Sequence, residues 1–186
     1  PAQAKKVASK KPGTKGLIYV VDDEEIIAET LTDILEDYGY QVKFFTNPDE
    51  VLAACKKEEP DLVCSDMKMP QMSGLELLQL LRKNNIYSSL IFITAHIDNH
   101  LLTEGLEAGA HGFLEKPFQG PQVITLANNA VSRSRTMKLL NRSLNYILYQ
   151  FNDLDNYLKS KKKEILRQSL KCELQELLKL RKELEK

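Results

Sequence analysis

The chain has 186 residues with equal numbers of basic and acidic side chains, so its formal net charge is zero. That length suits one domain of ordinary size with an extension. No apolar run reaches membrane-spanning length and no signal-peptide core is present, so we expect a cytoplasmic protein without a membrane partner. The three cysteines, Cys55, Cys64 and Cys172, are widely spaced and odd in number, which predicts apolar packing residues in a reducing compartment.

The charge is unevenly distributed along the chain. Residues 1–16 carry five lysines and no acid, while residues 17–131 carry 7 basic and 19 acidic residues. Residues 132–186 carry 14 basic and 7 acidic residues. We therefore expect a disordered basic tail at 1–15, an acidic domain at 16–131 and a basic extension at 132–186.

Short apolar strands alternate with amphipathic helices through the acidic domain. The expected strands are 17–21, 41–45, 62–66, 90–95 and 112–116. The expected helices are 24–38, 48–58, 74–84, 98–108 and one beginning near 121. Five such units predict an α/β fold, a doubly wound, five-stranded parallel sheet of the flavodoxin type with right-handed crossovers. The second strand mixes polar and apolar residues, which places it near an edge.

Polar side chains capable of chemistry stand where these strands end. Asp22 and Asp23 follow the first strand, Asp66 ends the third, Thr94 lies in the fourth and Lys116 in the fifth. Ligands of open α/β sheets bind at the carboxyl ends of the strands, so we expect these five residues to converge. Separate capping and turn roles for each residue are the weaker reading, because all five share one edge.

Neighbouring carboxylates destabilise each other unless a cation joins them. An oxygen-rich set with few ligands suits Mg²⁺, which keeps several waters and also coordinates phosphate. A nucleophilic carboxylate, Mg²⁺, a lysine and a hydroxyl together form a set suited to making an aspartyl phosphate. Glu24 and Glu25, which come next in the chain, are expected to cap and solvate the first helix turn, and a supporting role in the acidic pocket stays open as the alternative.

Four motifs, in this order, resemble the receiver domain of bacterial two-component response regulators. They are VVDDEE at 20–25, DMKMPQMSGLELL at 66–78, ITA at 93–95 and GAHGFLEKPF at 109–118. The resemblance covers about residues 15–131. It implies a phosphorylation-dependent signalling protein whose partner is a sensor histidine kinase or a phosphotransfer protein. Self-phosphorylation and self-dephosphorylation would be its only catalysis, and both would require Mg²⁺.

The resemblance also assigns the acceptor and the metal ligands. It implies that Asp66 accepts the phosphoryl group. Asp23, Asp66 and the backbone carbonyl of Lys68 would bind Mg²⁺ directly, and Asp22 would act through a bound water.

The remaining site residues follow from the same resemblance. Thr94 and Lys116 would hold the phosphoryl oxygens, and Thr94 and Phe113 would form the conformational switch. Pro117 predicts a cis peptide bond after Lys116, since ordered cis bonds are essentially a proline feature.

Beyond about Ser132 the resemblance ends and a heptad pattern begins. The first apolar seam consists of Met137, Leu140, Leu144, Ile147, Phe151, Leu154 and Leu158. The second runs through Leu166, Leu170, Leu177 and Leu184. Residues 122–186 contain no Pro or Gly, so one long helix and a hairpin turning at the lysine cluster 159–164 both fit. As one helix, some 50 residues would span roughly 75 Å, more than one small domain can cover. This favours a coiled coil or four-helix bundle, and a homodimer through residues 132–186, over a helix lying on its own receiver.

Other functions fit the sequence less well. No helix-turn-helix signal or aromatic interleaving accompanies the basic extension, so nucleic acid is not an expected partner. A haloacid-dehalogenase-like phosphatase is disfavoured because the chain reads DMK at Asp66, without a DxD arrangement. The alternative that stays open is the N-terminal receiver and linker helix of a longer regulator with an enzymatic or DNA-binding output.

Overall fold

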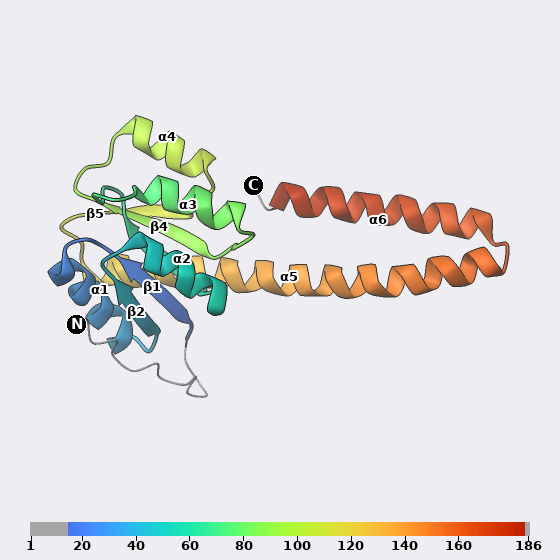
Figure 1. Ribbon diagram of the computed structural model, residues 1–186, viewed down its shortest axis with the longest axis horizontal. Helices are drawn as coiled ribbons and strands as arrows, with labels where there is room; N and C mark the ends of the chain where they lie inside the picture. The colour runs from blue at the N-terminus through green and yellow to red at the C-terminus, as the bar shows by residue number, and fades with distance from the viewer. Residues whose placement is uncertain (1–14, 185–186) are drawn as a thin grey trace. The chain divides into compact units, whose positions relative to one another are not determined.

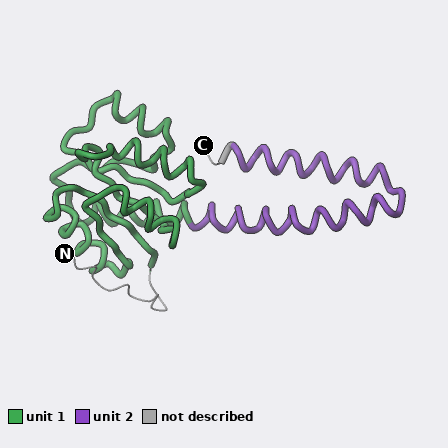
Figure 2. Tube along the Cα trace, in the orientation of Figure 1, with its two compact units in different colours: residues 1–134 green, residues 135–186 purple. Residues whose placement is uncertain are grey.

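The computed structural model describes residues 15–184, with side chains to residue 182 (Figure 1). Two compact units divide between Ser134 and Arg135 (Figure 2). The expected basic tail lies outside the described residues except for Lys15, whose N–H donates to the carbonyl of Gly39 at 3.1 Å. No helix within residues 15–184 is long and apolar enough to cross a membrane.

Five parallel strands form the sheet of the first unit in the order β2-β1-β3-β4-β5. They are β1 (Leu17–Val21), β2 (Gln41–Phe45), β3 (Leu62–Asp66), β4 (Ser89–Thr94) and β5 (Gly112–Glu115). The predicted doubly wound parallel fold is confirmed, and each strand lies within one residue of its expected bounds. The strand of mixed character, β2, is at an edge, as predicted.

Helices cover both faces of the sheet (Figure 1). They are α1 (Glu25–Asp37), α2 (Pro48–Lys57), α3 (Gly74–Lys83), α4 (Asn99–Glu107), α5 (Gly120–Ser160) and α6 (Glu164–Leu184). On one face α1 and the start of α5 pack against alternate strand residues such as Ile18 and Val20. On the other face α2, α3 and α4 pack against Tyr19, Val63 and Phe92. Because successive strand side chains point to opposite faces, a strand covered on both faces is apolar throughout.

Four helices end with one residue in the left-handed backbone conformation. These residues are Gly39, Asn85, Gly109 and Lys162, with φ of 92°, 58°, 90° and 55°. In each case the N–H of this residue donates to the carbonyl three positions before it. The N–H of the following residue donates to the carbonyl five positions before that residue. This Schellman ending satisfies carbonyls that a helix terminus leaves free. The ending at Lys162 closes α5 and lets α6 return beside it.

The second unit is therefore a helical hairpin, one of the two arrangements compatible with the sequence. The guanidinium of Arg167 donates to both carboxylate oxygens of Asp155, at 2.6 and 3.2 Å. In a continuous helix these residues, 12 positions apart, would be separated by roughly 18 Å. The ion pair can form only because the chain turns back.

The heptad seam expected on α5 is divided in the hairpin. Met137, Leu144, Phe151 and Leu158 are half-buried or buried, whereas Leu140, Ile147 and Leu154 remain exposed. The inward-facing set is completed instead by Asn141, Leu148 and Asp155, which stand four positions after the first three members. Within one chain only one of the two rows is covered, because a single antiparallel neighbour covers only one side of the helix.

The cysteines differ in their surroundings. Cys55 and Cys64 are buried, as predicted, and burial raises the pKa of the Cys64 thiol to about 12. Cys172 is exposed on α6, so the packing role expected for it is wrong.

Candidate functional site

The site lies at the carboxyl ends of the neighbouring strands β1 and β3, where the order in which the chain adds strands to the sheet reverses. Strands β1 and β3 are neighbours, and Val21 pairs with Ser65 in their register. The next residues, Asp22 and Asp66, are therefore brought side by side at the carboxyl edge. In open α/β sheets this reversal of strand order leaves the crevice in which ligands bind.

Lys116 joins the two carboxylates. Its Nζ lies 2.9 Å from Oδ2 of Asp22 and 2.8 Å from Oδ1 of Asp66, and 3.7 Å from Oε1 of Glu24. The backbone N–H of Lys116 donates to the carbonyl of Thr94 at 2.8 Å, which extends the β4–β5 ladder to the site. The Lys116–Pro117 peptide bond is cis, as predicted. The structure thus brings together three of the predicted site residues.

Burial and pairing act in opposite directions on these groups. Asp22 is fully buried, and burial raises its pKa even though the hydrogen bond from Lys116 lowers it. Burial lowers the pKa of Lys116, but its bonds to Asp66 and Asp22 outweigh that effect and the pKa is raised overall. Lys116 is therefore charged at neutral pH and supplies one positive charge to two carboxylates.

The Asp66 carboxylate is held in place by the loop that follows β3. Its Oδ2 accepts a hydrogen bond from the backbone N–H of Lys68 at 2.6 Å, and Ser65 Oγ donates to the Asp66 carbonyl at 2.8 Å. A Cβ atom on Gly74 would lie 2.5 Å from that carbonyl oxygen. Glycine at the start of α3 therefore permits the loop to close against the end of β3.

Thr94 is buried at the end of β4 and holds the loop that follows. Its hydroxyl donates to the carbonyl of His96 at 2.9 Å, and the His96 N–H lies 3.3 Å from the same hydroxyl oxygen. For Thr94 to donate to a ligand oxygen, it must release this carbonyl. A ligand at the site can therefore alter the loop between β4 and α4.

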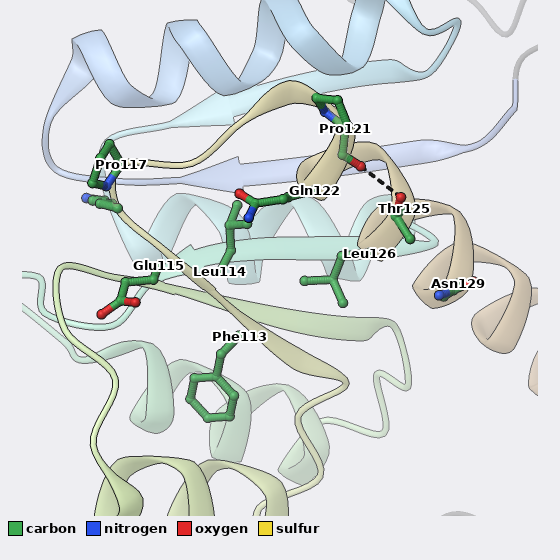
Figure 3. A pocket seen from close by; sticks show the side chains of 10 residues that line it. Phe113, Leu114, Glu115, Pro117, Pro121, Gln122, Thr125, Leu126 and Asn129 are labelled. Atoms are coloured by element: carbon green, nitrogen blue, oxygen red, sulfur yellow. Dashed lines mark hydrogen bonds between the residues drawn. The ribbon is translucent and has the colours of Figure 1, made fainter.

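Phe113 on β5 lies between the sheet and α4, the helix that follows this loop. Its ring packs against Phe92 with centroids 5.4 Å apart and points away from the α5 side chains in Figure 3. A Cβ atom on Gly105 of α4 would come within 2.5 Å of Phe113 Cζ. Sequence reasoning missed Gly105, although a glycine inside an amphipathic helix is itself a signal of close packing.

A cavity of about 640 Å³ opens on the other side of β5, against the first turns of α5 (Figure 3). Leu114 and Lys116 line one wall, and Gln122, Thr125 and Leu126 line the other. Asp66 is not among its lining residues. Lys116 is thus shared between the carboxylate site and this separate hollow.

The acidic residues around the site differ in exposure. Asp23 is exposed, and within residues 15–184 no three Asp, Glu, His or Cys side chains form a group able to hold a metal ion. Glu24 occupies the N-cap position of α1, but its side chain makes no capping bond. The capping role expected for Glu24 is therefore wrong, because its carboxylate lies toward Lys116 instead.

Comparison with known proteins agrees with this geometry. Residues 18–128 match the response regulator receiver domain. The chain is 32% identical over 140 residues to the DNA-binding transcriptional regulator NtrC of Proteus hauseri, covering 75% of this chain and 29% of that protein. It is 31% identical over 121 residues to the transcriptional regulatory protein FixJ of Bradyrhizobium diazoefficiens, covering 65% of this chain and 59% of that protein.

The solved structure of the chemotaxis protein CheY4 of Vibrio cholerae superposes with a TM-score of 0.59 at 28% identity. The match covers 61% of this chain and 97% of that one, so the similarity is to a complete receiver fold. The chain spans only part of the NtrC and FixJ proteins that it matches. Through residues 18–128, the chain belongs to the response regulator receiver domain family.

Proposed function

We propose that this receiver accepts a phosphoryl group on Asp66 from a partner histidine kinase and passes the signal to its C-terminal helices. Receiver domains of response regulators are phosphorylated by histidine kinases, and this chain belongs to that family. The observation that carries the assignment is the position of Lys116, whose ammonium contacts both Asp22 and Asp66. Asp22 is also bonded by Lys116 and by a backbone N–H, but its side chain is fully buried. Asp66 ends the central strand β3 and keeps 9% of its side chain exposed.

The transfer reaction can be written with these residues. A carboxylate oxygen of Asp66 attacks phosphorus of a phosphohistidine, the P–O bond forms and the P–N bond breaks. The imidazole nitrogen leaves with the electron pair and takes up a proton. Lys116 then pairs with a phosphoryl oxygen, and Thr94 gives up the His96 carbonyl to donate its hydroxyl to another.

The charge of the predicted donor set favours Mg²⁺, although only two of its carboxylates, Asp22 and Asp66, stand together in the structure. Asp22 and Asp66 share one ammonium, so the buried pair retains excess negative charge, and the raised pKa of Asp22 reflects the cost of burying its charge. Carboxylates and a backbone carbonyl are the oxygen ligands that Mg²⁺ prefers. Asp22, Asp23, Asp66 and the carbonyl of Lys68 would hold it, and when bound it supplies positive charge to the phosphoryl oxygens.

The same site would end the signal by hydrolysis. Water attacks phosphorus in line with the bond to Asp66, that P–O bond breaks, and the carboxylate and inorganic phosphate are released. These two reactions at Asp66 are the only catalysis proposed for the chain.

The signal would leave the site through Thr94 and Phe113. Movement of the Thr94 hydroxyl changes the loop before α4, and the Phe113 ring packs against Gly105 of that helix. Output would then proceed through residues 132–186, which we propose form a homodimer.

Treatment of the purified chain with acetyl phosphate and Mg²⁺ tests the acceptor. Intact-mass spectrometry should show one added phosphoryl group, absent in Asp66→Asn and without Mg²⁺. Asp61→Asn, which alters an acid on the opposite edge of the sheet, is the matched control and should be labelled normally. Stoichiometric labelling of Asp66→Asn at another residue would remove Asp66 from this role.

A further inference from the structure

The helical hairpin formed by α5 and α6 lacks a core of its own. Of the side chains described between residues 135 and 182, only Leu158 is buried. The inward-facing rows are otherwise half-buried, which leaves them less covered than the interior of a globular domain. Since helices derive most of their stability from tertiary packing, this unit calls for a further surface to pack against.

A second row of apolar residues is left uncovered on both helices. This row, which we call the outer stripe, consists of six exposed residues: Leu140, Ile147 and Leu154 of α5, and Leu166, Leu177 and Leu180 of α6. Their exposed fractions range from 39% to 57%, although all six are large and apolar. On α5 they recur every seven residues, which is the spacing of a helix-packing seam.

Helix geometry places both halves of the outer stripe on one face of the hairpin. Every member stands one position before an inward-facing residue, as Ile147 stands before Leu148 and Leu177 before Leu178. The stripe is therefore rotated from the inner rows in the same sense on both helices. Because the helices are antiparallel and face each other, the same sense of rotation brings both rows to the same side.

The opposite face of the hairpin is mostly polar, apart from Tyr149, which stands one position after Leu148 and is exposed. The exposed residues of this face include Asn145 and Asn152 on α5 and Gln168 and Gln175 on α6. The lysines of residues 159–163 lie at the turn, beyond the α5 half of the stripe. The apolar face can therefore be covered without burying these lysines, and Glu173, one position before Leu174, is the charged residue within the α6 row.

We propose that a second copy of this chain covers the outer stripe, so that two hairpins stack face to face as a four-helix bundle. A two-fold axis makes an apolar face complementary to its own copy. The six residues expose on the order of 500 Å², so two facing stripes supply about the 1,000 Å² of total buried area that a specific interface needs. Two antiparallel helix pairs complete a bundle in which both inner and outer rows are covered.

This inference rests on the proposed dimerisation and assigns it to one face. Native mass spectrometry at tens of micromolar should give the mass of two 21.2-kDa chains for the wild type. Ile147→Glu with Leu177→Glu places a charge on each half of the stripe and should give monomers. Asn152→Glu with Gln175→Glu places the same charges on the polar face and should remain dimeric.

Several results would overturn the assignment. A monomeric wild type would mean that another protein covers the stripe or that nothing does, and would also remove the proposed dimer. A dimer that survives Ile147→Glu with Leu177→Glu would retain dimerisation but exclude this face. Labelling of Asp66 in the same samples reports separately on the receiver, so failure of the phosphoryl transfer is distinguished from failure of the interface.

Cysteine cross-linking keeps the test independent of whether glutamate variants fold. In a Cys172→Ser background, the remaining native cysteines, Cys55 and Cys64, are buried. A short bismaleimide should cross-link Ile147→Cys into covalent dimers at least severalfold faster than Asn152→Cys. Equal rates at the two positions would contradict the proposed face.

Discussion

A Cβ atom added to Gly105 of α4 would lie 2.5 Å from Cζ of Phe113 on β5 and 3.1 Å from Phe92. The absence of a side chain at residue 105 therefore allows the Phe113 ring to lie against α4. A methyl group there requires the ring or the helix to move. The position of the proposed switch residue thus depends on a glycine that is distant in sequence from the carboxylate site.

Gly105→Ala should lower the free energy of unfolding by about 1–3 kcal/mol, the usual cost of overpacking. In a Phe113→Leu background the closest contact is removed while Phe92 remains at 3.1 Å, so the same change should lower the free energy of unfolding by markedly less. Urea unfolding of the four proteins measures both values. An equal effect of Gly105→Ala in the two backgrounds would show that the ring is not the obstacle.

Asp22→Asn should become relatively more stable than the wild type as the pH rises from about 4 to neutral. The pKa of Asp22 is raised in the folded protein by burial, so its ionisation opposes folding. Protonated Asp22 therefore stabilises the folded wild type at a pH below its unfolded-state pKa. This stabilisation is lost as the pH rises through the folded-state pKa of Asp22. Asparagine does not ionise and escapes this loss.

Urea unfolding in EDTA across this pH range measures the difference. Asp33→Asn, at an exposed position of α1, is the matched control for loss of one acidic charge. If the stability advantage of Asp22→Asn over the wild type shrank toward neutral pH, the prediction would be wrong.

Lys68→Ala should shorten the lifetime of the phosphorylated protein severalfold without preventing phosphorylation. Lys68 is exposed, and its backbone N–H is bonded to Asp66, so its side chain begins beside the proposed acceptor. Its ammonium can pair with the phosphoryl oxygens and hinder attack by water. A bias of about 1.4 kcal/mol toward the ground state slows hydrolysis about tenfold.

The lifetime is measured from the decay of the phosphorylated mass at fixed pH and Mg²⁺ concentration. Lys68→Arg retains the charge and should decay at close to the wild-type rate. Identical decay of Lys68→Ala and the wild type would place the ammonium outside the reaction.

Lys162→Gly should stabilise the hairpin. Lys162 has φ of 55°, a conformation that costs a residue with a Cβ atom about 1 kcal/mol and costs glycine little. The gain in a glycine variant is reduced by its greater freedom in the unfolded chain, so we expect a net gain of about 0.5 kcal/mol. Lys162→Val should destabilise, since a β-branched residue tolerates this conformation poorly.

Thermal unfolding followed by circular dichroism measures these effects. Lys161→Gly removes a neighbouring lysine where the backbone is not left-handed, and it should not stabilise. Equal gains from Lys161→Gly and Lys162→Gly would attribute the effect to charge and not to the helix ending.

The amino-acid sequence alone determined the sheet and the convergence of Asp22, Asp66 and Lys116. Strands buried on both faces must be apolar, and the carboxyl ends of parallel strands share one edge. Residues at those ends are therefore brought together whatever the intervening helices contain. The edge position of β2 followed from its mixed composition for the same reason.

Only the tertiary structure decided which side chains contact one another and which remain exposed. It assigned Glu24 to the vicinity of Lys116 instead of a helix cap, and it brought Gly105 against Phe113. It also divided the heptad seam of α5, covering Leu144 and leaving Ile147 exposed. A helical period shows which residues are apolar and how they are spaced, but which row is covered depends on where the neighbouring helix lies, and that depends on where the chain turns back.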